Sequence, residues 1–171
     1  MYSHFGVLYW KAKNVEWLYL EVEGGYGNVT SFDKIEDLAL TVVSDYKLGK
    51  LFDQSEEKFK KFCDGLLMNA VAQFTECRQD LAYDDVARSF DADLSVLEVY
   101  ILSRYWVIAW WERETNNAAQ IALKLKVSSA FTFNSEAQNF KEKQNIIDKL
   151  REEVDRATQD YLLLDIAAYE F

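Results

Sequence analysis

Histidine and cysteine, which supply most transition-metal ligands and many catalytic groups, are nearly absent from this sequence. His4 is the only histidine, and Cys63 and Cys77 are the only cysteines. Helical di-iron sites need paired Glu-x-x-His motifs and zinc sites need several His or Cys ligands, so both are excluded. A Ser-His-Asp triad would have to use His4, near a chain end that often frays, although a triad needs a firmly held imidazole. We therefore expect no metal ion, no cofactor and no catalytic activity.

Proline is absent, and there are only six glycines. The one glycine-rich piece, Gly24 to Asn28, lacks the spacing of a phosphate-binding loop and the Lys-Ser/Thr that follows such a loop. It therefore predicts a turn. Because no Pro-, Gly- or Ser-rich linker divides the chain, we expect residues 1–171 to form a single domain with a substantial core.

Basic residues are a minority, with 19 Lys and Arg against 29 Asp and Glu, giving a net charge of −10. Nucleic-acid binding needs a basic surface, so direct binding to DNA or RNA is disfavoured. A strongly acidic chain suits a soluble protein that repels its own copies, or one that meets a basic partner.

Two cysteines that are expected to be unpaired, together with the absence of a signal peptide, indicate the cytoplasm. If Cys63 and Cys77 lie on one helix, about 21 Å separates them along the axis, which is too far for a disulfide. Two free thiols are typical of a reducing compartment. The first residues lack the basic and apolar regions of a secretory signal.

One long apolar run, residues 94–126, predicts a helix around which the other elements pack. Its positions from Val99 to Trp111 are apolar almost throughout, so the helix needs cover on all sides. Ser95 and Glu98 have the spacing of a capping box at its start. Charged residues within the run argue against a membrane span. The sequence at 115–117 leaves open a bend or break.

The N-terminal part predicts a β-hairpin over residues 5–23, with strands at 5–10 and 15–23. Alternation in the second strand puts aliphatic side chains on one face and Trp17, Tyr19 and Glu21 on the other. The latter face is therefore expected to be partly exposed.

Helical spacing predicts the remaining elements within a helical part at residues 30–168. A first helix is expected from about residue 30 to 49, a second from about 53 to 79, and a last from Asn134 or Ser135 to about 168. Residues 80–93 are expected to form a loop with one helical turn, and 127–133 a link that could be a strand.

The apolar stripe of the first helix consists of Ile35, Leu38, Ala39, Val42 and Tyr46. The stripe of the second consists of Phe59, Phe62, Cys63, Leu66, Ala70, Phe74 and Cys77. The fold class is thus α+β and mostly helical, with the hairpin packed on a bundle of about four helices.

The last helix has apolar residues in a seven-residue pattern typical of helix-to-helix packing. The pattern predicts packing on the central helix, with a dimer seam as the alternative, and so either a monomer or a homodimer. The two rows are Phe140, Ile147, Val154, Tyr161 and Ala168, and Leu150, Ala157, Leu164 and Phe171.

The segment 80–93 is the most acidic stretch and the main candidate for a binding surface. With the outward face of the hairpin it provides the candidate partner-binding residues, namely Asp80, Tyr83, Asp84, Asp85, Asp91, Asp93, Trp17, Tyr19 and Glu21. Carboxylates can also bind Mg²⁺ or Ca²⁺, but the EF-hand pattern is missing. Aromatic side chains beside acids are common anchors of protein interfaces.

These features favour an acidic, non-enzymatic protein that covers a basic surface on a partner protein, such as a nuclease or a nucleic-acid-handling complex. Toxin-immunity proteins and phage-encoded inhibitors of host defence have this profile. A subunit that assembles through its C-terminal helix is one alternative. An enzyme that uses carboxylate-bound metal at 80–93 is another.

Overall fold

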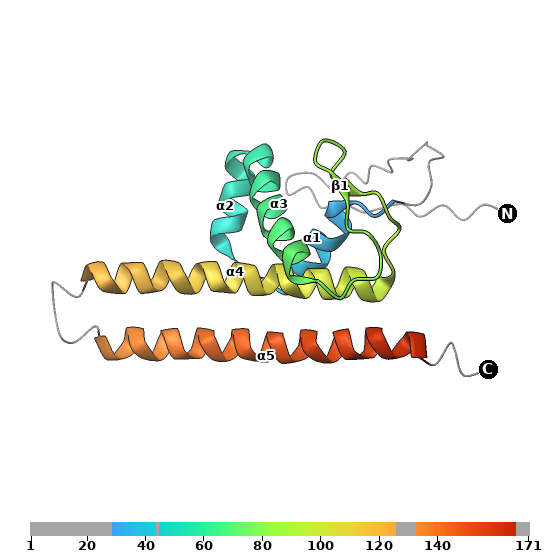
Figure 1. Ribbon diagram of the computed structural model, residues 1–171. Helices are drawn as coiled ribbons and strands as arrows, with labels where there is room; N and C mark the ends of the chain where they lie inside the picture. The colour runs from blue at the N-terminus through green and yellow to red at the C-terminus, as the bar shows by residue number, and fades with distance from the viewer. Residues whose placement is uncertain (1–28, 44, 126–132, 167–171) are drawn as a thin grey trace.

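The computed structural model describes residues 29–43, 45–125 and 133–166, and most of them are helical. The elements in chain order are α1 (Phe32–Leu40), α2 (Tyr46–Gln54), α3 (Glu56–Gln73), β1 (Tyr83–Asp84), β2 (Ser89–Phe90), α4 (Val96–Leu125) and α5 (Phe133–Ile166). The prediction of a mostly helical chain is confirmed. In Figure 1, α4 and α5 run antiparallel as two long helices, and the other elements lie on the side of α4 away from α5.

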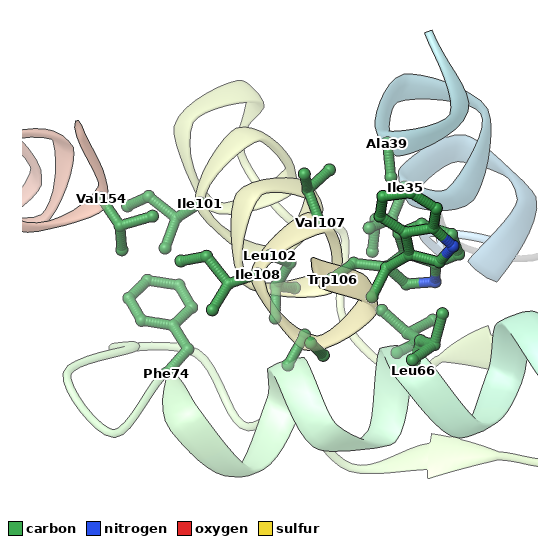
Figure 2. Close-up of a cluster of buried hydrophobic side chains, with 14 of the residues drawn as sticks. Ile35, Ala39, Leu66, Phe74, Ile101, Leu102, Trp106, Val107, Ile108 and Val154 are labelled. Carbon is green, nitrogen blue, oxygen red and sulfur yellow. The ribbon is translucent and has the colours of Figure 1, made fainter. Parts of the chain in front are cut away.

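The core is built around α4, which packs against α1, α3 and α5. Figure 2 shows Ile101 of α4 facing Val154 of α5, whereas Trp106 points toward Ile35 of α1 and Leu66 of α3. All five side chains are buried, and the Trp106 indole N–H donates to the backbone oxygen of α3 residue 63 at 3.0 Å. A helix that is apolar on most faces is therefore covered on most faces.

The start and length of α4 agree with its sequence signals. The backbone N–H of Ser95 donates to the Glu98 carboxylate at 2.7 Å, and the Glu98 N–H donates to the Ser95 hydroxyl at 3.3 Å. This is the predicted capping box. The helix is not broken at 115–117, since it runs on to Leu125, and the Thr115 hydroxyl donates to the backbone oxygen of Trp111 within it.

The prediction of one helix from 30 to 49 is wrong, because two helices occupy this stretch. Ser31 caps α1, and Asp45 caps α2 by accepting from the Lys47 N–H at 2.8 Å. The second cap starts a separate helix, so the residues expected to form one apolar stripe do not share one helix face. Of these residues, Ile35 and Ala39 are buried, whereas Leu38, Val42 and Tyr46 are exposed.

The second predicted helix also ends earlier than expected, at Gln73 rather than near Gln79. Phe74 leaves the helical conformation and turns into the core, where its ring meets the Tyr161 ring edge-on at 5.7 Å. Cys77 therefore lies beyond α3, half-buried, while Cys63 stays on the buried face of α3. Both cysteines are free.

The prediction of a loop with a helical turn at 80–93 is wrong. The segment contains β1 and β2, joined by a four-residue turn at 85–88. Among the described residues, a small antiparallel sheet thus forms in a stretch where no strand was expected.

The C-terminal helix begins at Phe133, so the predicted caps Asn134 and Ser135 lie inside it. Its apolar rows pack against α4 within the chain. The buried members are Ile147, Leu150, Val154, Ala157 and Tyr161. Leu164 is exposed because α5 extends past the first turn of α4 (Figure 1).

The predicted hairpin at 5–23, with Trp17, Tyr19 and Glu21, lies outside the described residues. The possible strand at 127–133 also lies outside them, except for Phe133, the first residue of α5.

Candidate functional site

The acidic segment 80–93 forms a hairpin that is tied to the chain in front of α1. β1 pairs with β2 in antiparallel register, with Tyr83 opposite Phe90. On the other side of β2, the Phe90 N–H donates to the Thr30 oxygen at 2.8 Å, and the Phe32 N–H donates to the Arg88 oxygen at 2.9 Å. β2 therefore lies between β1 and the segment that leads into α1.

The turn of the hairpin is set by Asp84. Its carboxylate accepts from the backbone N–H groups of Val86 and Ala87 at 2.7 and 2.9 Å. These two hydrogen bonds, strongest from Ala87, lower the pKa of Asp84, so it remains ionised in neutral solution. The Val86 side chain in the turn is 96% exposed, which makes it an apolar contact point directly after Asp84 and Asp85 in the chain.

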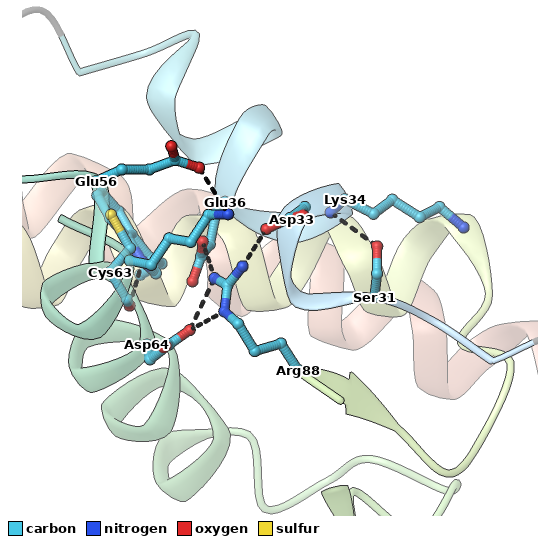
Figure 3. Close-up of polar contacts among 10 residues, drawn as sticks. Ser31, Asp33, Lys34, Glu36, Glu56, Cys63, Asp64 and Arg88 are labelled. Atoms are coloured by element: carbon cyan, nitrogen blue, oxygen red, sulfur yellow. Dashed lines mark hydrogen bonds and ion pairs between the residues drawn. The ribbon is translucent and has the colours of Figure 1, made fainter. Parts of the chain in front are cut away.

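The outward-facing charge of this hairpin is entirely negative. Its exposed acids are Asp80, Asp84, Asp85, Asp91 and Asp93. Arg88 is the only basic residue between 80 and 93, and its side chain points inward to α1 and α3 (Figure 3). No cation of the segment itself thus neutralises the outer surface.

Arg88 fastens the hairpin to the helices through three carboxylates. Its guanidinium donates to Glu36 at 2.7 Å, to Asp64 at 2.8 and 2.9 Å, and also to Asp33. The backbone of Arg88 has a φ of 51°, in the left-handed region that side chains other than glycine rarely adopt. The ion pairs with α1 and α3 explain why arginine occupies this position.

Three carboxylates around one guanidinium leave an excess of negative charge, and Glu36 is the most deeply buried of them. Burial raises the pKa of Glu36 to about 7, although the charge and hydrogen bond of Arg88 oppose the shift. The second carboxylate oxygen of Glu36 has no hydrogen-bond partner among the described residues. Ionisation of Glu36 is therefore unfavourable in the folded protein.

This shift predicts that stability falls as pH rises from about 4.5 to about 7, because the folded state holds the Glu36 proton more tightly than the unfolded chain. Glu36→Gln, which carries no charge, removes this dependence. We expect the variant to match the original protein near pH 5 and to be more stable at pH 8, by up to about 3 kcal/mol. Urea unfolding at a series of pH values measures the difference. Parallel pH profiles of the two proteins would contradict the prediction.

A second buried acid, Glu98, anchors the chain that leads into the hairpin. Its carboxylate accepts from the Tyr161 hydroxyl at 2.6 Å, from Gln79 at 3.1 Å and from the Ser95 N–H at 2.7 Å. Burial opposes ionisation, but these hydrogen bonds outweigh it and lower the pKa of Glu98. Tyr161 in turn accepts from the Arg78 N–H at 2.9 Å, so α5, α4 and the loop after α3 meet at one carboxylate.

Of the predicted site residues, those in 80–93 lie together on the hairpin. Tyr83 is 40% exposed, and its ring packs edge-on against Phe32 at 5.9 Å, so it is partly structural. Sequence reasoning missed Val86 and Arg88, which both lie in the turn between β1 and β2. The sequence from Tyr83 to Phe90 does not alternate polar and apolar residues, so periodicity gave no signal for the two short strands.

Comparisons with protein families, curated proteins and solved structures found no match to this chain. Within 29–43, 45–125 and 133–166, no three His, Cys, Asp or Glu side chains form a group that could hold a metal ion. No helix in this described part has the length and apolar character needed to cross a membrane.

Proposed function

We propose that the hairpin at 80–93 is a docking surface for a basic partner protein, and that the chain acts as a cytoplasmic, non-enzymatic binding protein or inhibitor. The observation that carries this proposal is the arrangement of the hairpin charges. Five aspartates face outward, while the only arginine of the segment is turned into the helices.

The mechanism follows from the surface and its support. Aspartates on one projecting element attract a basic surface over a distance of about one Debye length, and they speed the encounter. Val86 and the exposed part of Tyr83 add apolar contact on the same element. Because Arg88 and the Thr30 segment hold the hairpin in place, little order has to be gained on binding.

Inhibitors that cover the nucleic-acid-binding surface of an enzyme need these properties. They imitate the charge of the nucleic acid without its chemistry, and a toxin-immunity protein or a phage anti-defence protein is the class that fits. The two free cysteines agree with a reducing compartment.

The proposal predicts that neutralising Asp85, Asp91 and Asp93 together to asparagine weakens partner binding by about tenfold or more, since charge pairs across an interface each contribute of the order of 1 kcal/mol or more. Within the part of the chain described here, no hydrogen bond uses these three carboxylates, so the variant should fold normally. Immobilised protein is exposed to lysate of the source organism and of its neighbours, and bound proteins are eluted with salt and quantified.

A matched control changes the same charge elsewhere on the surface. Glu153→Gln with Asp155→Asn and Asp160→Asn removes three exposed acids of α5. The expected result is a basic protein retained by the original chain and by this control but lost from the hairpin variant. Equal retention by all three proteins would contradict the proposal.

The alternative of self-assembly through the C-terminal helix has less support. The residues that it requires, such as Ile147 and Val154, are buried against α4 in the same chain.

A further inference from the structure

A concave site lies apart from the acidic hairpin, where α2 crosses α3 and α4. It has a volume of about 380 Å³, at the small end of the range for ligand pockets. Leu48, Leu51, Phe62 and Trp110 supply apolar and aromatic lining. Trp110 and Leu48 belong to the buried core, so this part of the lining is firmly held.

Three basic side chains line the same cleft. Lys47 is paired with Glu114 at 3.0 Å. The Lys50 ammonium lies 4.6 Å from the centre of the Tyr46 ring, and the Arg113 guanidinium lies 4.2 Å from the centre of the Phe62 ring. In the described ranges, no carboxylate pairs with Lys50 or Arg113. Each cation thus lies against an aromatic ring, which for Lys50 is the exposed Tyr46 ring, and keeps its hydrogen-bond donors available.

The two acids of the lining are already engaged by neighbours. Asp45 caps α2 through the Lys47 N–H. Glu114 accepts from Lys47 on one oxygen and from Asn117, at 3.4 Å, on the other. In a chain with ten more acids than bases, a cleft that retains two unpaired cations is an exception to the overall charge.

We propose that this cleft binds a small aromatic anion. Its ring lies against the apolar lining, and its phosphate or carboxylate lies between Arg113 and Lys50. A guanidinium stacked on a ring presents a fixed pair of N–H groups, which suits two oxygens of one anion. The site is separate from the hairpin, because no residue of 80–93 lines it.

Calorimetric titration with 1-naphthyl phosphate, 1-naphthoate and neutral 1-naphthol tests this inference. We expect both anions to bind more tightly than the naphthol. Lys50→Gln with Arg113→Gln should weaken the anions by about tenfold or more, because charge-assisted hydrogen bonds are lost. Tighter binding of the phosphate than of the carboxylate would assign the natural ligand to the phosphates, and the reverse order to the carboxylates.

The matched control, Lys58→Gln with Arg156→Gln, removes one exposed lysine and one exposed arginine elsewhere, and should bind like the original protein. If the cleft variant unfolds, the original protein is titrated at low salt and in about 0.5 M NaCl instead. The added salt should weaken the binding of both anions and leave the binding of naphthol unchanged, and anion binding that does not respond to salt would overturn the inference. The inference is overturned if no anion binds at up to about 5 mM, an affinity too weak for a specific site. It is equally overturned if naphthol binds as well as the anions, or if the folded cleft variant binds them unchanged.

Discussion

Replacing Arg88 with methionine is expected to lower the free energy of unfolding by about 2–3 kcal/mol at pH 8, less than the loss for a fully buried ion pair, because only Glu36 of its partners is buried. The guanidinium contacts Asp33, Glu36 and Asp64, and its side chain is only 18% exposed. Without it, three carboxylates of α1 and α3 face one another with no counter-charge. Urea unfolding followed by circular dichroism measures the loss.

Arg151→Met is the matched control, because it removes an arginine that pairs with Glu112 at 2.7 Å on the surface. An exposed pair of this kind contributes less than about 1 kcal/mol. The loss on Arg88→Met should also be smaller near pH 5, where Glu36, with its raised pKa, holds a proton and less negative charge is left uncompensated. A similar, pH-independent loss in both variants would show that Arg88 does not neutralise the acidic cluster of Asp33, Glu36 and Asp64.

The central helix could be predicted from sequence because its signals are local. Ser95 and Glu98 are three positions apart and form the capping box within one turn. A run that is apolar on most faces can only be stable when covered, and the neighbouring helices supply that cover. The length of the run distinguished a helix from a strand, because strands rarely exceed about ten residues.

The hairpin and its anchor could not be predicted in this way because they depend on distant residues. Arg88 meets Asp64 and Asp33, which lie 24 and 55 positions away in sequence. β2 is stabilised by Thr30 as well as by β1. The aspartates of the candidate site were evident from composition, but the tertiary contacts that fix the hairpin carrying them were not.

The separation of α1 from α2 was missed for a different reason. The apolar spacing continues from Ile35 to Tyr46 across the end of α1, so periodicity alone suggests one helix. Asp45 was the local signal for a new start, since aspartate is a favoured N-cap. A favoured N-cap residue inside an apolar stripe is therefore stronger evidence for a helix boundary than the spacing is for a continuous helix.

Glu98→Ala is expected to destabilise the fold by about 3 kcal/mol, because several buried donors lose their acceptor at once. The Tyr161 hydroxyl and Gln79 amide both donate to this carboxylate, and Glu98 is only 2% exposed. The variant therefore loses the contact that joins α5 and the loop after α3 to the start of α4. Thermal and urea unfolding measure the change.

Glu112→Ala makes the same substitution at a more exposed position of the same helix, where the partner is Arg151, and should cost less than about 1 kcal/mol.

The pKa of Glu98 is lowered in the folded protein, so the contribution of Glu98 to stability is present above about pH 4.5 and is lost as pH falls through that lowered value. The gap between Glu98→Ala and the original protein should therefore narrow in acid. A double-mutant cycle with Tyr161→Phe should give a clear coupling energy, since the two side chains are in direct contact. Equal losses at Glu98 and Glu112, without coupling to Tyr161, would mean that the helices are joined by apolar packing alone.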